Sequence, residues 1–294
     1  MDNKNVFIAI ALSMSVLLFW AAFFETPRQA NTNKNLPQNE QIKPSENNIT
    51  PNIDATIKVK TISREESLKV SKRVKIENNN IIGSLSLKGG IVDDISFKKH
   101  KQNLKNKKNV EFLNPAETKD GFYAETGWAS INNKIDVPTR ESVWKVVGNS
   151  VLTENQSITL EWNNKKGIIF KKIIELDDKF LFKIKQVVQN NTGSSIELYP
   201  YAQLTRNKIP DDIQNFYISH EGFIGVFDEE LKEDDYDDVE EKKIVREANE
   251  GWLGITDKFW VMALVPAAEE NFKSTFLYNK SFKANYIHNN PTLI

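Results

Sequence analysis

Three histidines are the residues best suited to acid–base chemistry near neutral pH: His100, His220 and His288. His220 directly precedes Glu221, so a base and an acid are adjacent, as a sugar epimerase on a β-sandwich would need. The pair does not extend to the zinc pattern His-Glu-x-x-His, because the position three residues after Glu221 is an isoleucine. A structural histidine at a strand edge is the competing interpretation. A carbohydrate-binding or epimerase-like protein therefore stays open as an alternative.

Other chemical motifs are missing from the sequence. There is no cysteine, which excludes disulfides, thiolate zinc sites and thiol nucleophiles. No phosphate-binding loop, dinucleotide fingerprint or nucleophile elbow is present. We therefore expect no catalytic residue, no metal site and no cofactor, and we predict that the chain is not an enzyme.

Two charged runs interrupt the chain. Residues 98–108 contain six lysines, and residues 228–241 contain ten acids in fourteen positions. We predict exposed loops in both places. Weak contact with anionic lipid is the alternative for the first run. A calcium site is the alternative for the second, although the run lacks the central glycine of an EF-hand loop. With 39 basic and 40 acidic residues the net charge is −1, which excludes a dedicated nucleic-acid binder.

The N-terminal segment is far more apolar than the chain as a whole, whose mean hydropathy is −0.48. Residues 6–24 form an uncharged, mostly apolar run, and a helix of this length spans about 28 Å, close to the thickness of a bilayer core. A cleaved signal peptide is the alternative, but Phe23, Phe24 and Glu25 make a poor cleavage site. We predict a membrane anchor made by Val6, Phe7, Ile8, Leu12, Val16, Leu17, Leu18, Phe19, Trp20, Phe23 and Phe24.

Charges around this segment favour one orientation. The amino terminus and Lys4 outweigh Asp2, whereas Glu25 and Arg28 cancel. By the positive-inside rule the N-terminus is then cytoplasmic and the polar remainder lies outside the cytoplasm. Residues 25–57 are rich in Asn, Gln, Pro and Glu, so we predict a disordered linker between residues 1–24 and a folded domain at 58–294.

From residue 58 the sequence predicts strands. Alternating apolar residues flank Gly89-Gly90 and predict one hairpin, and a second hairpin is predicted around Asp177-Asp178. The only helix predicted in this part is short, near residues 63–69. The fold class is mainly β, a sandwich or barrel of antiparallel sheets. Further strands are predicted at 72–76, 142–147, 151–153, 157–162, 195–204, 223–227, 251–256, 259–265 and 272–278.

One segment is more specific than these patterns. Residues 251–266 read GWLGITDKFWVMALVP. This run closely resembles a stretch in the large periplasmic domain of the YidC family of membrane protein insertases, in its alphaproteobacterial form. The N-terminal anchor and the segments 87–95, 111–115, 123–128, 190–192 and 199–202 resemble that family in the same order. The motif residues are Gly89, Gly90, Gly127, Trp128, Gly251, Trp252, Gly254, Asp257, Trp260 and Pro266.

A structural role is the favoured interpretation of these residues, and a partner surface is the alternative. Glycine allows close approach of two backbones, and Trp252, Phe259 and Trp260 are expected to supply large buried area.

The resemblance implies a function and a fold. Family members insert and fold membrane proteins in the bacterial inner membrane, alone or beside the Sec translocon. Their periplasmic domain is a β-supersandwich similar to galactose mutarotase, without known catalysis. The expected partners are inner-membrane lipid, nascent membrane proteins and Sec components, and no nucleic acid. We expect a single-pass protein whose main domain is periplasmic.

One departure from the family is large. The family's insertase core of five transmembrane helices has no counterpart here, since no later run of eighteen apolar residues exists. We therefore expect an N-terminal fragment whose sandwich is incomplete at its C-terminal end and which does not insert proteins by itself. A plain structural tether in an envelope complex is a further alternative.

Overall fold

The computed structural model describes residues 7, 12–16 and 19, and residues 61–294 except 106, 132–133, 212, 214–219 and 269. The contacts divide the chain into two units, residues 1–47 and residues 48–294. In the first unit, residues 12–16 are helical and exposed. Within the described residues, no helix is long and apolar enough to cross a membrane. Most of the predicted anchor, and the predicted linker 25–57, fall outside the described residues.

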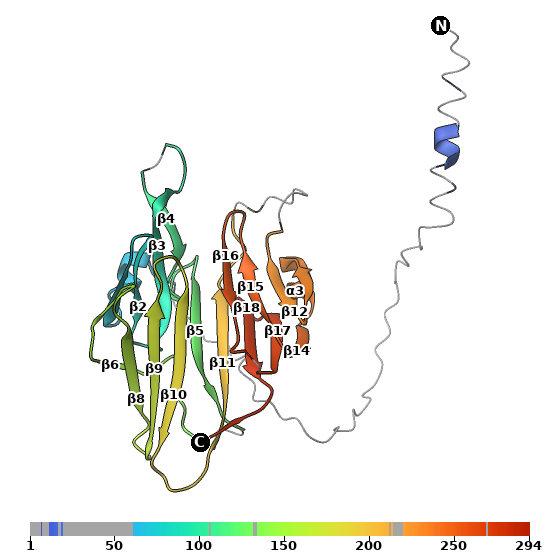
Figure 1. The fold of residues 1–294 in the computed structure, drawn as a ribbon. Coiled ribbons are helices and arrows are strands. Elements are labelled where there is room, and N and C mark those ends of the chain that lie inside the picture. The colour runs from blue at the N-terminus through green and yellow to red at the C-terminus, as the bar shows by residue number, and fades with distance from the viewer. Residues whose placement is uncertain are drawn as a thin grey trace, which may run out of the picture. The chain divides into compact units, whose positions relative to one another are not determined.

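The second unit is built on one large sheet (Figure 1). Its strands run in the order β14-β17-β18-β11-β5-β3-β2-β1-β7, with β4 paired to β3 and β19 to β11. All pairs are antiparallel except β1 with β7. The bounds are β1 Arg73–Glu77, β2 Ile81–Ser86, β3 Ile91–Lys101, β4 Asn109–Leu113, β5 Phe122–Ala129, β7 Val151–Leu152, β11 Glu197–Arg206, β14 Ile244–Ala248, β17 Phe272–Tyr278, β18 Phe282–His288 and β19 Thr292–Leu293.

Two four-stranded antiparallel sheets accompany the large sheet (Figure 1). The first runs β10-β9-β8-β6 and the second β13-β12-β15-β16. Apolar residues of all three sheets join in one core, so the arrangement is a layered sandwich. The bounds are β6 Lys145–Val147, β8 Ile158–Asn163, β9 Ile168–Leu176, β10 Phe182–Asn190, β12 Phe223–Phe227, β13 Glu230–Asp234, β15 Gly251–Thr256 and β16 Val261–Leu264, and the helices are α2 Arg64–Ser67 and α3 Tyr236–Glu241.

Alternation along the strands explains how the core forms. In β9 the side chains at Ile168, Phe170, Ile174 and Leu176 are buried, while their neighbours are half-buried or exposed. This two-residue period points every second side chain at the large sheet. The predicted mainly β class of antiparallel sheets is therefore confirmed.

Both predicted hairpins are present. Ser86 pairs with Ile91 across the Gly89-Gly90 turn, and both glycines have positive φ, 76° and 61°. Phe182 pairs with Leu176 across the Asp177-Asp178 turn. Such turns need residues that tolerate a left-handed backbone or that bond to their own turn, which glycine and aspartate do.

The acidic run corrects one prediction. Residues 228–241 are not a loop, because they form strand β13 and helix α3. Two apolar residues, Tyr236 and Val239, are buried on one side of α3 and hold it against the core. Acidic residues occupy the outer positions of α3. Two inward apolar residues among so many acids are too few to predict an amphipathic helix from the sequence. Strand β18 was also missed, because the buried polar residues Lys283 and Asn285 interrupt its apolar ones.

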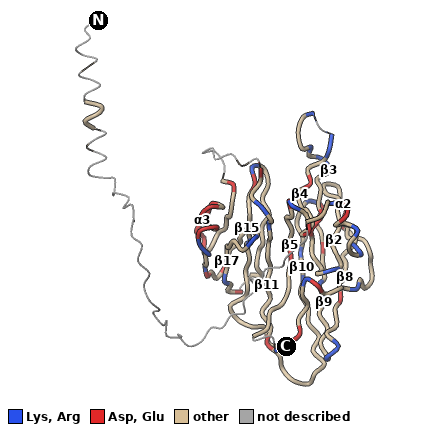
Figure 2. Tube along the Cα trace, turned by 180° about the vertical axis from the view of Figure 1, so that it is seen from behind, with Lys and Arg blue, Asp and Glu red and all other residues tan. Residues whose placement is uncertain are grey.

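The lysine run is a hairpin tip. Its first residues continue strand β3 to Lys101, and residues 102–108 connect to β4. Most of these side chains are exposed, and blue residues mark the tip in Figure 2. The predicted exposure is confirmed, and only the loop is shorter than expected.

Candidate functional site

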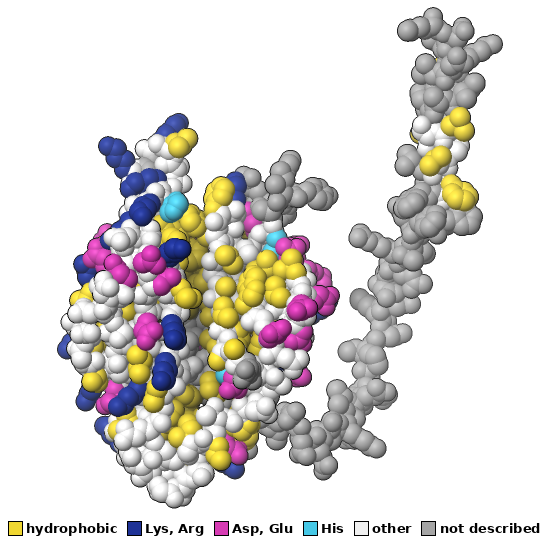
Figure 3. All heavy atoms as spheres, in the orientation of Figure 1, with side chains coloured by type: hydrophobic (Ala, Val, Ile, Leu, Met, Phe, Trp, Pro, Cys, Tyr) yellow, Lys and Arg dark blue, Asp and Glu magenta, His cyan; other side chains and the backbone are white. Residues whose placement is uncertain are grey.

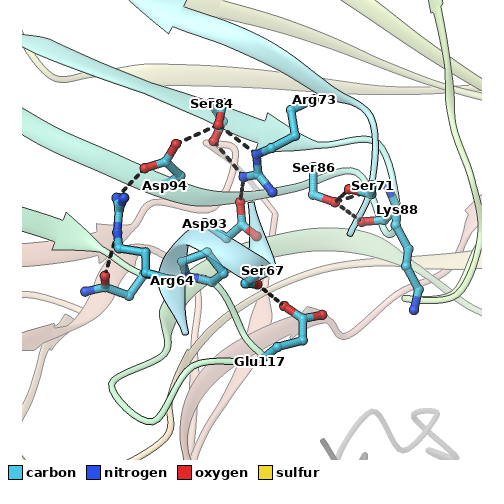
Figure 4. Close-up of polar contacts among 12 residues, drawn as sticks. Arg64, Ser67, Ser71, Arg73, Ser84, Ser86, Lys88, Asp93, Asp94 and Glu117 are labelled. Carbon is cyan, nitrogen blue, oxygen red and sulfur yellow. Dashed lines mark hydrogen bonds and ion pairs between the residues drawn. The ribbon is translucent and has the colours of Figure 1, made fainter. Parts of the chain in front are cut away.

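A polar cavity of about 330 Å³ lies beside helix α2 and the outer faces of strands β1–β3. It is lined by hydroxyl groups, by three basic and three acidic side chains, and by a few apolar ones. Figure 4 shows most of the polar residues pointing toward one another from α2, β1, β2 and β3. The charged lining residues are Arg73, Lys88, Arg140, Asp93, Glu117 and Glu141.

Strand register places these groups on one side. Arg73 pairs with Ser86 and Val74 pairs with Leu85 across β1 and β2. Val74 and Leu85 are buried in the core, so Arg73 and Ser86 face the other way, toward the cavity. Helix α2 begins at a capping box in which the Glu66 N–H donates to Ser63 Oγ at 3.2 Å.

Asp93 and Arg73 form the buried ion pair of the cavity. Asp93 is 2 % exposed, and Arg73 Nε also donates to Ser84 Oγ at 2.7 Å. Burial raises the pKa of Asp93 to about 6, although the Arg73 guanidinium opposes that rise. Next to this pair, Ser84 Oγ donates to Asp94 Oδ2 at 2.6 Å, and Asp94 pairs with Arg64 of α2.

A second buried charge cluster lies close by. Arg140 Nε is 3.1 Å from Glu125 Oε2, and the guanidinium carbon lies 4.6 Å from the centre of the Tyr123 ring. Burial alone would lower the pKa of Arg140, but the Glu125 charge and Tyr123 raise it above its ordinary value.

The buried Lys172 completes this cluster. Its Nζ donates to the Gly90 carbonyl at 3.1 Å and lies 4.8 Å from the Trp144 ring centre. Complete burial lowers its pKa to about 8 against the pull of Glu125.

The arrangement pairs charges and offers little reactivity. Ser67 Oγ donates to Glu117 at 2.9 Å, Ser71 and Ser86 share a bond of 2.7 Å, and Lys88 pairs with Glu141 at 2.8 Å. No hydroxyl here is bonded to a histidine base, and the described residues contain no group of three metal-ligating side chains. These hydrogen bonds and ion pairs hold α2 against the sheet, and the cavity leaves room for a small polar molecule.

The predicted acid–base residues are elsewhere. His220 Nε2 lies 2.8 Å from the Phe223 carbonyl and Nδ1 lies 3.6 Å from Asp235. His288 Nδ1 lies 3.4 Å from Glu270, and burial lowers its pKa against the Glu270 charge. Each therefore faces a carboxylate, as an epimerase would need, but neither lines the described cavity. The epimerase alternative gains no support from this placement.

The motif residues lie in two groups. Gly89 and Gly90 form the turn between the cavity residues Lys88 and Ile91, and a Cβ on Gly90 would lie 2.9 Å from Trp144 Nε1. Trp128 lies in the core, with its ring centre 5.1 Å from that of Phe170. Gly127 lies on β5, and its carbonyl accepts from Gln186 Nε2 at 2.6 Å. Trp144 connects Gly90 with Trp128, because it lies against Gly90 and its ring centre is 6.4 Å from that of Trp128.

The second group lies in and after the β15–β16 hairpin: Trp252 and Gly254 are on β15, and Pro266 follows the end of β16 by two residues. Gly251 has φ +132°, and a Cβ there would lie 1.9 Å from the Val226 carbonyl oxygen of the paired strand. Asp257 accepts two bonds of 2.9 Å from Arg206. These contacts agree with a structural role, which stays a prediction.

The aromatic residues of this hairpin correct one expectation. Phe259 is 74 % exposed, at the tip of the two-residue turn, so it supplies little buried area. Trp252 and Trp260 are half-buried. The Trp260 ring centre lies 4.4 Å from that of Phe97 and 4.9 Å from that of His100. The alternating pattern of a strand cannot tell a turn residue from a core residue when both are aromatic.

Sequence reasoning missed the buried charges, although a signal existed. Asp93 stands inside the apolar run of β3, and Lys172 occupies an inward position between Phe170 and Ile174. A charge at an inward position of a buried strand must have a partner. The identity of that partner depends on pairing across strands, which the sequence does not specify.

Comparison with known proteins now adds to this geometry. The family model of the YidC periplasmic domain matches residues 73–294. A membrane protein insertase YidC of Pelagibacter ubique is 42 % identical over 287 residues, covering 98 % of this chain and 51 % of that protein. The corresponding protein of Jannaschia sp. is 33 % identical, covering 94 % of this chain and 47 % of its own length. The chain belongs to the YidC family of membrane protein insertases.

Membership in the YidC family confirms the resemblance predicted from the sequence motifs. The chain spans about half the length of the curated relatives it matches. Among solved structures, a galactose mutarotase related enzyme from Lactobacillus acidophilus is similar, with a TM-score of 0.45 and 12 % identity, covering 74 % of this chain and 84 % of that one. A likeness at this level carries no argument about function.

Proposed function

We propose that this chain is the anchored, export-side part of a YidC insertase that helps insert and fold inner-membrane proteins. Its β domain serves as an accessory contact surface for membrane-protein substrates or for components of the Sec translocon. The match to the YidC periplasmic domain over residues 73–294 is the observation that carries this proposal.

The membrane arrangement belongs to the same proposal. Residues 1–24 anchor the chain in the bacterial inner membrane, residues 25–57 link the anchor to the domain, and residues 58–294 lie in the periplasm. The uncharged run at residues 6–24 and the periplasmic family match support this order.

Site-specific crosslinking tests the contact role. A photoreactive amino acid is placed at exposed positions on the β domain of the full chain, in cells that synthesise a polytopic membrane protein. We expect crosslinks to that nascent membrane protein or to translocon subunits, and none to a secreted soluble protein made at the same level. Equal labelling of both, or labelling of neither, would overturn the proposal and favour a plain tether.

The carbohydrate-binding alternative makes a different demand. It requires a cleft that contains a histidine and a carboxylate, but the described cavity contains carboxylates without a histidine. Isothermal titration with monosaccharides is therefore expected to give no heat of binding.

A further inference from the structure

Strand β16 is an open sheet edge. It ends the order β13-β12-β15-β16 and pairs with β15 alone. A sheet edge presents unpaired backbone N–H and C=O groups, and proteins usually protect it with charged side chains or by keeping it very short.

The described edges of this molecule follow that rule, with β16 as the exception. Charged side chains lie on β4, β6, β10, β13 and β14, and β7 and β19 have only two residues each. On β10, for example, Lys183 and Lys185 are exposed. Residues 261–265 read VMALV and contain no charge. Among the edge strands that the structure describes, β16 is the one longer than two residues without a charged side chain.

The hairpin register shows which backbone groups are free for pairing. Asp257 and Trp260 exchange two backbone bonds, of 2.7 and 3.3 Å, around the Lys258-Phe259 turn. Because bonded and non-bonded pairs alternate along an antiparallel ladder, Val261 and Ala263 turn their N–H and C=O groups away from β15. No described residue forms a hydrogen bond with these outward backbone groups.

Side chains of β16 add an apolar surface to this edge. Val261 is 54 % exposed and Val265 is 66 % exposed, while Met262 and Leu264 are half-buried against the core. In Figure 1, β16 lies at the margin of its sheet that faces β5 and β10, and Figure 3 shows apolar side chains along the strip between the two small sheets. An added strand would therefore gain both backbone bonds and apolar contacts.

We propose that β16 binds an extended, uncharged apolar peptide segment, which adds to the sheet as a further strand. Outward backbone groups at alternate residues match the bonding pattern of such a peptide, and a lipid surface would leave them unpaired. The inference rests on the proposed function only for the identity of the natural ligand, which is an apolar stretch of a membrane protein outside the bilayer. The binding itself depends on β16 alone.

A peptide titration tests this inference. The full chain is placed in nanodiscs of neutral lipid, and the probe is a fluorescent peptide of about ten alternating Val and Thr residues with a solubilising polyethylene glycol tail. We expect saturable binding, and a loss of at least about tenfold in affinity when the peptide backbone is N-methylated, since the side chains then stay and the donors are gone.

Two substitutions test the same edge from the protein. Val261→Lys adds a protective charge, and Ala263→Pro removes an outward N–H. Each is expected to weaken binding at least about tenfold. Val147→Lys is the matched control, because Val147 is 48 % exposed on the separate edge strand β6 and its substitution should leave binding unchanged. Circular dichroism identifies any variant that does not fold, and Val261→Lys then carries the test alone.

Several outcomes would overturn the inference. Equal affinity for the methylated and unmethylated peptides would show that the peptide binds a hydrophobic surface without pairing as a strand. Equal binding by empty nanodiscs would show a lipid effect, and a doubled mass without peptide would show that β16 pairs with a second copy. Failure here leaves the crosslinking result untouched, so the two proposals fail separately.

Discussion

The first half of the β domain, residues 73–190, and the second half, residues 197–288, contribute to one core but treat polar groups differently. The first half buries more charged side chains, namely Asp93, Asp94, Glu125 and Lys172. In the described part of the second half, Lys283 is the only buried side chain among Asp, Glu, Lys and Arg, whereas both halves bury rings, for example Phe170 and Phe223. Among the described edge strands longer than two residues, strand β16 of the second half is also the one without a charged side chain.

This difference teaches how each half is specified. A buried charged side chain constrains the position of the neighbouring groups, because its partner must lie within hydrogen-bonding distance. Buried aromatic rings stabilise the fold through the apolar surface area that they bury, and they tolerate small changes in their position. The predictions below test this contrast through paired substitutions, one in each half where the chain offers a match.

The largest effects are expected from buried rings in both halves. Phe170→Ala and Phe223→Ala each remove a ring that is 0 % exposed, so each should lower the free energy of unfolding by about 3–5 kcal/mol. Urea unfolding followed by tryptophan fluorescence measures both. If one substitution cost less than about 1 kcal/mol, the shared core would not extend through that half.

Two glycines with positive φ separate backbone conformation from close approach. Gly251→Ala in the second half should destabilise by about 3 kcal/mol, because its Cβ would lie 1.9 Å from the Val226 carbonyl oxygen. Gly148→Ala in the first half has φ +83° and nothing within 4 Å, so only about 1 kcal/mol is expected. Thermal melts of both variants give the comparison, and equal losses would contradict it.

Stability should depend on pH through Asp93 in the first half. The folded-state pKa of about 6 lies above the ordinary value of 3.8, so the folded chain binds this proton more tightly. Its contribution is complete below about pH 4 and is lost as the pH rises through 6, by about 2–3 kcal/mol in total.

The measurement is the difference in unfolding free energy between the unsubstituted chain and Asp93→Asn, taken from pH 4 to 7. Only the change of this difference with pH matters, since the substitution also leaves Arg73 with a weaker partner. A difference that stays constant across this range would show that Asp93 does not titrate there.

The smallest effects are expected at the β15–β16 turn. Trp260 is half-buried against Phe97, so Trp260→Ala should cost about 2 kcal/mol. Phe259 is 74 % exposed, and Phe259→Ala should change stability by less than about 0.5 kcal/mol. Differential scanning calorimetry compares the two. A larger loss at Phe259 than at Trp260 would reverse the assignment of the two rings.

Local sequence patterns predicted much of the fold. Strands β12, β15 and β17 agree residue by residue with the predicted ranges 223–227, 251–256 and 272–278. Turns at Gly89-Gly90 and Asp177-Asp178 were readable because glycine and aspartate favour those backbones. Strand β13 and helix α3 were not, since exposed acids masked the two inward residues Tyr236 and Val239.

The cavity was less accessible to prediction. Arg73, Asp93 and Arg140 come from distant places in the chain, and only strand pairing brings them to one cavity. The position of Asp93 within an apolar run predicted that it needs a charged or hydrogen-bonding partner, but it did not predict which residue that partner is.

The sequence by itself determined the class of protein, since an uncharged N-terminal run and an ordered series of motifs identify the YidC family. It also determined the short-range elements, because alternation and turn chemistry act between neighbours. Only the tertiary structure decided which charges meet, that Phe259 is exposed, and that β16 ends a sheet. The physical reason is that these properties depend on which strand lies beside which, and that order is a long-range outcome of packing.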